Sequence, residues 1–159
     1  MQGRPVRDSR VIKTELVLPS DTNSLGSVFG GTVMSWIDIA AAIAAQRHSQ
    51  SEVVTASIDA LDFVAPVYVG WVVNLQASVN FAGRTSLEVG VRVDAENPRT
   101  GESHHTASAY LTFVAIDKQR KPRPVPPVIP ETDEEKRRFA DAQRRRHLRL
   151  QARAGSVNC

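Results

Sequence analysis

Apolar and polar residues alternate along much of the second half of the chain. Between positions 71 and 81 the odd-numbered residues are apolar and the even-numbered ones mostly polar, and the same period of two recurs from 87 to 93. Successive side chains of a strand point to opposite faces of a sheet, so this pattern predicts two strands with one face on a core. Residues 53–63 and 103–116 are expected to form two more strands, and Gly- and Pro-containing turns separate the four.

Residues 32–48 have apolar positions on nearly every side of a helix. Alanine is abundant there and neither Gly nor Pro interrupts the run, which favours helix formation. Because almost the whole circumference is apolar, we expect this helix to be central and buried. One β-rich run, residues 11–18, precedes it and ends at Pro19. One strand, one helix and four strands predict an α+β fold, in which an antiparallel sheet wraps around one long buried helix.

The chain changes character after Asp117. Five prolines between positions 122 and 130 predict an extended connector. Thr132 and Glu135 have the spacing of a capping box, which would open a charged helix that continues to about Arg153. We therefore expect three regions: a flexible N-terminal tail over residues 1–10, a single domain over 11–128, and the end of the connector with the charged helix over 129–159.

The composition fits one domain in a reducing compartment. At 159 residues the chain can bury one core, and Cys159 is its single cysteine, so no intrachain disulfide can form. The longest apolar stretch, residues 32–45, contains Asp38 and is too short for the roughly 30 Å of a bilayer core. The polar N-terminus does not resemble a secretory signal. We expect a cytoplasmic protein with no membrane partner.

The charges are segregated along the chain. Residues 1–117 hold 8 Lys and Arg against 12 Asp and Glu, and residues 118–159 hold 12 against 5, so a basic C-terminal part follows a mildly acidic domain. Acidic residues are interleaved with the arginines of the predicted C-terminal helix. This mixture is more typical of a solvated helix than of a nucleic-acid-binding one, so we expect no nucleic-acid partner.

Asp38 is the most informative residue of the sequence. It lies about two turns inside the predicted helix among apolar neighbours, and no Lys or Arg stands three or four positions away. A carboxylate is costly to bury without a partner, and this one is beyond the reach of a capping role. A structural salt bridge remains the alternative, but the position favours a functional carboxylate.

Gly30 and Gly31 immediately precede the predicted helix. Their missing side chains would let a ligand approach free backbone N–H groups at the helix N-terminus, which suits a developing oxyanion; a flexible hinge is the alternative. Asn23, on the turn-rich stretch before them, could hydrogen-bond a water or a carbonyl. Gly31 and Asp38 are separated by about 10 Å along one helix. If both act on one carbonyl, the site needs a second, antiparallel copy of the helix.

Other chemistries find little support in the sequence. His104 and His105 are adjacent in a strand and point to opposite faces, so they cannot chelate one metal ion. No phosphate loop, nucleophile elbow or zinc spacing occurs, and we expect neither a metal nor a cofactor. Arg84, in the turn formed with Gly83, Thr85 and Ser86, could bind phosphate, although an arginine in an exposed turn is often only solvated.

Together these segments resemble a known family, the hotdog-fold acyl-CoA hydrolases of the YciA-like and brain-type group. The resemblance is carried by residues 23–38, 53–57, 83–86 and 109–117, with Phe63, Pro66 and Gly70 between them. It covers roughly residues 10–128. It implies a single hotdog domain that hydrolyses fatty acyl-CoA to the free acid and CoA.

The resemblance also implies roles for individual residues. Asp38 would activate the hydrolytic water or attack the thioester, Asn23 of the opposite protomer would position water or thioester, and the Gly31 N–H would bind the carbonyl oxygen. Gly30 would line the same site, and Arg84, with Thr85 and Ser86, would lie where the CoA nucleotide binds. The family's assembly of dimers into trimers of dimers would make the protein a homohexamer.

Two other functions are considered. A hotdog domain that binds or senses acyl-CoA without hydrolysing it would not need Asn23 and Asp38 together, and would normally bring a DNA-reading domain. A dehydratase of the same fold would need a histidine in the helix region, whereas His48 lies at the far end of the predicted helix.

Overall fold

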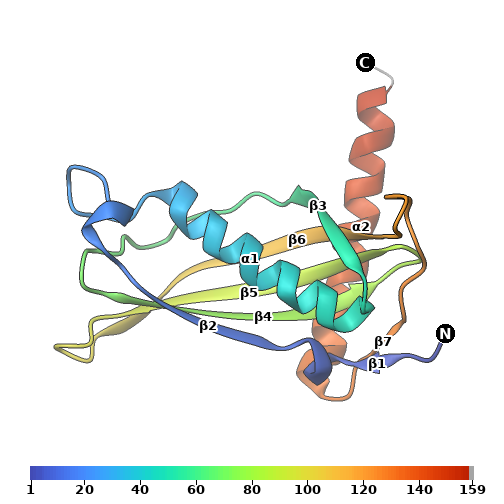
Figure 1. The fold of residues 1–159 in the computed structure, drawn as a ribbon, viewed down its shortest axis with the longest axis horizontal. Coiled ribbons are helices and arrows are strands. Elements are labelled where there is room, and N and C mark those ends of the chain that lie inside the picture. The colour runs from blue at the N-terminus through green and yellow to red at the C-terminus, as the bar shows by residue number, and fades with distance from the viewer. Residues whose placement is uncertain (158–159) are drawn as a thin grey trace.

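A five-stranded antiparallel sheet forms the body of the molecule (Figure 1). The computed structural model describes residues 1–157, so Cys159 lies outside the described residues. The strands follow one another across the sheet in the order β2-β4-β5-β6-β3. Their bounds are Val11–Leu16 for β2, Glu52–Ile58 for β3, Val72–Ala82 for β4, Ser86–Glu96 for β5 and Ser103–Ile116 for β6. The five strands expected from the sequence are therefore confirmed, although β3 ends before the expected Phe63.

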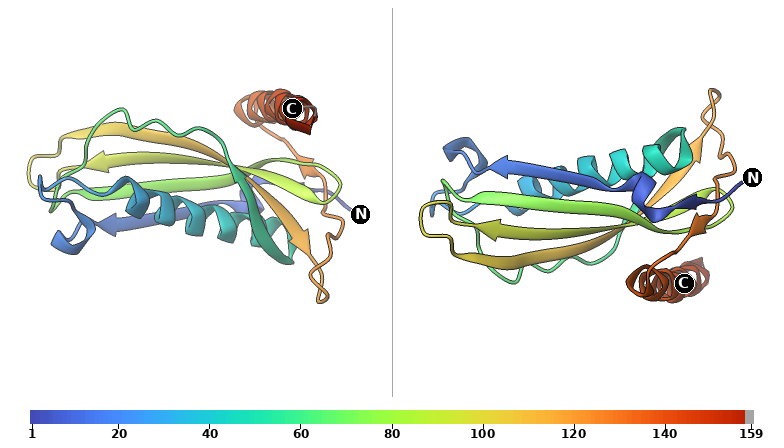
Figure 2. Two further views of the ribbon diagram at one scale, coloured as in Figure 1. Left: turned by 90° about the horizontal axis from the view of Figure 1, so that it is seen from above. Right: turned by 90° about the horizontal axis from the view of Figure 1, so that it is seen from below.

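The long helix α1, Gly30–Ser49, lies along the inner face of this curved sheet (Figures 1 and 2). The predicted α+β class, with an antiparallel sheet wrapped around one helix, is confirmed. Residues from one side of α1 pack into the core formed with the inner face of the sheet: Val33, Ile37, Ala40, Ala41, Ala44 and Ala45. The helix ends at Gln50, whose left-handed backbone (φ 54°) closes the last turn through an N–H to the Gln46 carbonyl at 2.7 Å.

The opposite side of α1 is uncovered within one chain. Met34 and Ile39 are 39% and 46% exposed. Val54 of the edge strand β3 is exposed to the same extent as Met34, at 39%. The expectation that the helix is buried all round is therefore met on one face only. Apolar surface of this kind on a helix and an adjoining sheet edge is typical of a region that another chain covers.

The N-terminal residues do not form the flexible tail that the sequence predicted. Strand β1, Arg4–Pro5, pairs in parallel with β7, Val128–Ile129, and the 3₁₀-helix η1, Val6–Ser9, follows it. The Val6 side chain is buried, and the Ser9 hydroxyl accepts a hydrogen bond from the backbone N–H of Val79 at 2.9 Å. Burial of Val6 and this hydrogen bond fix a segment whose composition alone is polar. A second 3₁₀-helix, η2 (Pro19–Asp21), follows β2.

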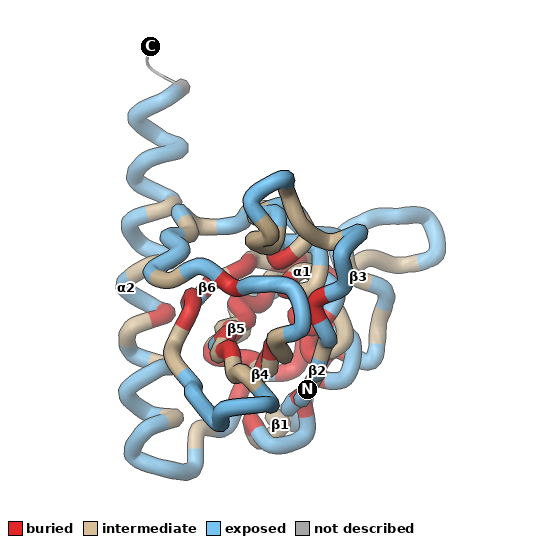
Figure 3. Tube along the Cα trace, turned by 90° about the vertical axis from the view of Figure 1, so that its left-hand side faces the viewer, coloured by how far each residue is buried: buried red, intermediate tan, exposed pale blue. Residues whose placement is uncertain are grey.

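The charged helix α2, Asp133–Val157, crosses the outer face of the sheet, on the side away from α1 (Figure 2). Its start is close to the predicted cap, because the Glu135 N–H donates to the Thr132 hydroxyl at 3.1 Å. The Glu135 carboxylate accepts from the N–H of Glu131 instead of that of Thr132. Most of α2 is exposed (Figure 3), but Ala142 is fully buried. Phe139 packs edge-to-face on Phe81 of β4, with the two ring centres 5.1 Å apart.

Three ion pairs, of Arg145 with Glu88 and of Arg149 with Asp59 and Glu88, also hold α2 to the rest of the domain. Glu88 of β5 is buried and accepts hydrogen bonds from Arg145 Nε at 2.7 Å and Nη2 at 3.1 Å. Arg149 donates to Asp59 at 2.9 Å. Burial would lower the pKa of Arg145, but its hydrogen bond and charge interaction with Glu88 outweigh that effect and raise it. The guanidinium also lies 3.7 Å from the centre of the Tyr110 ring.

Candidate active site

The structure gives Asp38 a specific partner on the neighbouring strand. Asp38 is half-buried on α1, and its Oδ1 accepts a hydrogen bond from the Thr55 hydroxyl of β3 at 2.9 Å. Its second oxygen has no hydrogen-bond partner among residues 1–157, so it can accept a proton or a hydrogen bond from a bound molecule. A carboxylate oriented by one hydroxyl and open on the other oxygen can act as a base or a nucleophile.

Thr55 was not singled out from the sequence. It stands in a β-rich run with other hydroxyl and valine residues, where a threonine is an ordinary strand residue. Only the approach of β3 to α1 gives it a role. The available signal was weak: the run 53–57 belongs to the segments that resemble the hotdog hydrolases.

Gly30 and Gly31 are the first two residues of α1, so the prediction that they precede the helix is wrong by two residues. Phe29 is the N-cap and has no side-chain cap, and its carbonyl accepts from the N–H groups of Thr32 and Val33. The first N–H groups of a helix lack partners inside it. In the described chain, no hydrogen bond is found for the N–H groups of Gly30 and Gly31, which suits them to an anionic oxygen.

The two glycines serve different needs. A Cβ on Gly30 would lie 3.3 Å from the Phe63 ring, so this position lets the aromatic side chain approach the helix. A Cβ on Gly31 would meet nothing within 4 Å. Gly31 is exposed, so a ligand or another chain can approach its backbone.

Asn23 organises the loop that leads into α1. Its side-chain oxygen accepts from the N–H of Leu25 at 2.9 Å and from the N–H and hydroxyl of Ser27 at 3.3 and 3.2 Å. These bonds fix the orientation of the amide. The side-chain NH₂ has no hydrogen bond to the described residues and is free to donate. A second link, from the Phe29 N–H to the Asp21 carbonyl at 2.9 Å, ties the loop to the helix start.

One chain keeps the two halves of this arrangement apart. Asn23 and Gly31 lie at the start of α1, whereas Asp38 lies about 10 Å further along the same helix. Catalytic contacts need about 3 Å. The carboxylate and the free N–H therefore cannot reach one carbonyl within a single copy.

The predicted nucleotide-binding turn, residues 83–86, lies directly before β5 and beside α2. Thr85 and Ser86 line a hollow of about 230 Å³ between the outer face of the sheet and α2. Arg84 is exposed and is not among the residues that line this hollow. Its carbonyl accepts from the N–H of Val125 at 2.9 Å, so its backbone anchors the proline-rich connector.

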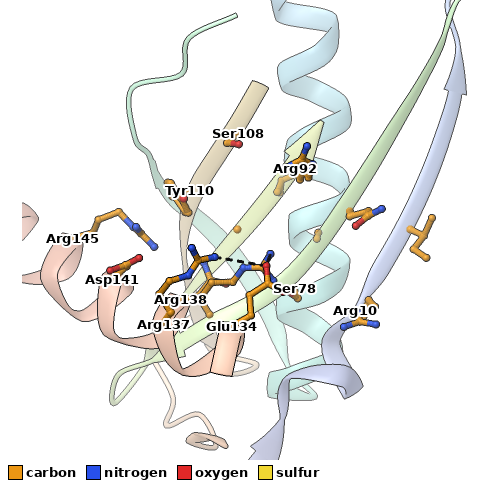
Figure 4. Close-up of a pocket in the computed structure, with 16 residues that line it drawn as sticks. Arg10, Ser78, Arg92, Ser108, Tyr110, Glu134, Arg137, Arg138, Asp141 and Arg145 are labelled. Atoms are coloured by element: carbon orange, nitrogen blue, oxygen red, sulfur yellow. Dashed lines mark hydrogen bonds and ion pairs between the residues drawn. The ribbon is translucent and has the colours of Figure 1, made fainter. Parts of the chain in front are cut away.

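Another hollow, of about 750 Å³, is lined by none of the predicted site residues (Figure 4). It lies between α2 and the outer face of β4, β5 and β6. Four of its arginines already have acidic partners: Arg92 pairs with Asp94, Arg137 and Arg138 with Glu134, and Arg145 with Glu88. Asp38, which Thr55 positions through a hydrogen bond, and the first residues of α1 lie outside this hollow.

Among residues 1–157, no group of three or more His, Cys, Asp or Glu side chains is placed to hold a metal ion. His104 packs against Trp71 and His105 contacts Asp94, so the two histidines have separate surroundings. None of the helices in this part of the chain is both long and apolar enough to cross a membrane.

Comparison with known proteins identifies the family. Residues 25–102 match the profile of the thioesterase superfamily. The chain is 46% identical over 134 residues to the uncharacterized acyl-CoA thioester hydrolase YkhA of Bacillus subtilis, covering 84% of this chain and 78% of that protein. The chain belongs to the thioesterase superfamily. Two solved members of this superfamily are also similar in structure along nearly their whole length.

One is a hexameric acyl-CoA thioesterase, with 49% identity, a TM-score of 0.93, and coverage of 97% of this chain and 99% of that one. The other is an acyl-CoA hydrolase from Staphylococcus aureus in complex with butyryl-CoA, CoA and CoA disulfide, with 39% identity, a TM-score of 0.90, and coverage of 98% and 94%. The same enzyme has been solved as three alanine variants, of an aspartate, an asparagine and a threonine.

Animal relatives are longer than this thioesterase-superfamily chain. The cytosolic acyl coenzyme A thioester hydrolase of Mus musculus is 37% identical over 140 residues, which cover 87% of this chain. The chain spans 36% of the length of that relative.

Proposed function

We propose that this chain hydrolyses acyl-CoA thioesters to the free acid and CoA, in active sites that two copies of the chain share. The observation that carries the proposal is the half-buried Asp38 carboxylate, held on one oxygen by Thr55 and open on the other. Relatives of similar length named as acyl-CoA thioester hydrolases support the substrate class.

The proposed chemistry uses the N–H of Gly31, the carboxylate of Asp38 and the side-chain amide of Asn23. The free N–H of Gly31, beside Gly30, binds the thioester carbonyl oxygen and stabilises the negative charge that develops on it. Asp38 either takes a proton from a water that attacks the carbonyl carbon, or attacks that carbon itself and forms a mixed anhydride, which water then hydrolyses to release the free acid. In either route the C–S bond breaks, and the CoA thiolate leaves and takes up a proton. Both routes need the same carboxylate and the same oxyanion donor, and neither needs a cofactor.

Asn23 is proposed to complete the site through its free side-chain NH₂, which can donate to the water or to the thioester. The Staphylococcus aureus variants support this set of residues. The asparagine, aspartate and threonine altered there are spaced along that chain as Asn23, Asp38 and Thr55 are here.

A second copy of the chain is required by the distance between the two halves of the site. If the uncovered face of α1 packs against its symmetry mate in antiparallel orientation, Asp38 of one copy approaches Gly31 and Asn23 of the other. Such a two-fold contact covers the exposed Met34 and Ile39 of both copies. A similar enzyme is hexameric, which supports the further proposal of a trimer of dimers.

The cellular location of the enzyme and its contact with the CoA nucleotide are further parts of the proposal. The mouse relative is named as cytosolic, which supports a cytoplasmic location for this chain. Arg84 is proposed to meet the nucleotide end of CoA, since its exposed guanidinium has no ion-pair partner among the described residues. Its fork of donors suits phosphate.

A thiol-release assay over a series of acyl-CoA chain lengths tests the function. The wild-type chain should release CoA without added metal, and Asp38→Asn should lower the rate by at least ~100-fold, the usual scale for a positioned base. Circular dichroism and the oligomeric state of the variant should match the wild type, because Asn can still accept from Thr55.

Two outcomes would contradict the proposal. Release no faster than in buffer for every chain length would leave only binding, and would favour the acyl-CoA sensor. Near-normal turnover in a folded Asp38→Asn variant would return Asp38 to a structural role.

A further inference from the structure

The inner side of α2 carries arginines toward a second hollow on the outer face of the sheet. Arg146, Arg149 and Arg153 are three and four positions apart, so they lie on one side of the helix. All three line the hollow of about 230 Å³ that Thr85 and Ser86 also line. The guanidinium groups of α2 thus lie on one side of this hollow, and the turn before β5 lies on another.

The charges in this hollow do not cancel. Arg149 pairs with Asp59 at 2.9 Å and with the buried Glu88 at 3.4 Å. Glu88 is in turn the partner of Arg145 at 2.7 Å. Neither Arg146 nor Arg153 forms an ion pair with any residue that the structure describes. Two cations are therefore left without a counter-charge at one small hollow.

The turn before β5 is shaped to receive one of these cations. A Cβ on Gly83 would lie 3.4 Å from both Nε and Nη2 of Arg146 and 3.3 Å from the Ser86 hydroxyl. The glycine lets the guanidinium lie directly against the turn. Hydroxyl groups of Thr85 and Ser86, with Ser57 of β3, stand on the same walls. Guanidinium forks surrounded by hydroxyl donors are a typical environment for phosphate oxygens.

The hollow also reaches β3, the strand whose Thr55 hydroxyl donates a hydrogen bond to the Asp38 carboxylate of α1. Ala56 and Ser57 line it, and they follow Thr55, the hydrogen-bond partner of Asp38, directly in β3. One strand residue advances the chain by about 3.3 Å. A ligand with a phosphate in this hollow would therefore have its other end near the edge strand of the proposed active site.

We propose that α2 completes the binding site for the phosphorylated nucleotide end of CoA. Arg146 and Arg153 bind phosphate oxygens, and the hydroxyl groups of Ser57, Thr85 and Ser86 donate beside them. This inference rests on the proposed function and extends it, because it gives substrate recognition to the helix for which the family resemblance implied no role.

Kinetics on full-length and truncated substrates test the assignment. The double variant Arg146→Gln/Arg153→Gln should raise KM for an acyl-CoA at least ~10-fold, the effect of losing about one charge-assisted hydrogen bond. Its kcat should change little. The hydrolysis of the same acyl group on pantetheine, which lacks the nucleotide, should be unaffected. The matched control is Arg137→Gln/Arg144→Gln, which removes the same charge from α2 residues that do not line this hollow.

Calorimetry with adenosine 3′,5′-bisphosphate separates this inference from the proposed function. The wild type and the control variant should bind it, and the Arg146/Arg153 variant should bind at least ~10-fold more weakly. A wild type without hydrolysis would overturn the proposed function, while this titration would still decide the role of α2. Equal KM and equal affinity for the two double variants would overturn the inference and leave the proposed function standing.

Discussion

Asp38 and Thr55 show what single residues reveal before and after folding. A carboxylate inside an apolar helix without a basic neighbour is unusual enough to be found from the sequence alone. A threonine in a strand is common, so Thr55 acquires meaning only when β3 brings its hydroxyl to 2.9 Å from Asp38. A functional role can be predicted for a residue that is unusual in its local sequence, such as Asp38. It cannot be predicted for one that is ordinary there, such as Thr55.

Thr55→Val removes the hydroxyl and keeps the shape of the side chain. We expect kcat for acyl-CoA hydrolysis to fall by about fivefold, since the lost hydrogen bond that orients Asp38 is worth about 1 kcal/mol. Thr55→Ser keeps the hydroxyl and should retain most of the activity. Steady-state kinetics of the two folded variants check this. Equal rates for Val and Ser would show that the hydrogen bond does not matter for catalysis.

At the scale of the elements, the periodic segments were predictable and the docked ones were not. Alternation located β4 and β5, and the alanine-rich run located α1 to within two residues at its start. Strand β1 was missed because two residues give no period and their partner, β7, lies far away in the chain. The charged run of α2 was correctly predicted as a helix, but its contacts with the sheet depend on Glu88, which no local pattern connects to it.

Glu88→Gln tests how α2 is attached. The change keeps the size of the side chain but leaves Arg145 and Arg149 without their buried carboxylate. We expect the free energy of unfolding to fall by about 1–3 kcal/mol, measured by urea denaturation, because the arginines remain partly desolvated. Glu134→Gln, which removes an exposed partner of Arg138, should change it by less than about 0.5 kcal/mol. Equal effects of the two substitutions would mean that the Glu88 pairs do not anchor α2.

At the scale of the whole molecule, the proposed active site needs a second copy of the chain. The proposed catalytic carboxylate and oxyanion donor lie about two turns apart on one helix, and Met34 and Ile39 of that helix are exposed. The offset was predictable from the numbering of Gly31 and Asp38. The sequence could not reveal the open face, because the same apolar residues would equally have fitted a helix buried within one chain.

Subunit complementation tests the shared site most directly. Asn23→Ala and Asp38→Ala should each be inactive, and they are mixed in equal amounts under conditions that exchange subunits. In a mixed dimer one site carries both lesions and the other carries neither. Random exchange makes about half of the dimers mixed, so about a quarter of the wild-type acyl-CoA hydrolysis should return if the sites act independently. If both residues came from the same chain, every site would keep one lesion. A mixture that stays inactive after subunit exchange has been verified would contradict the shared active site.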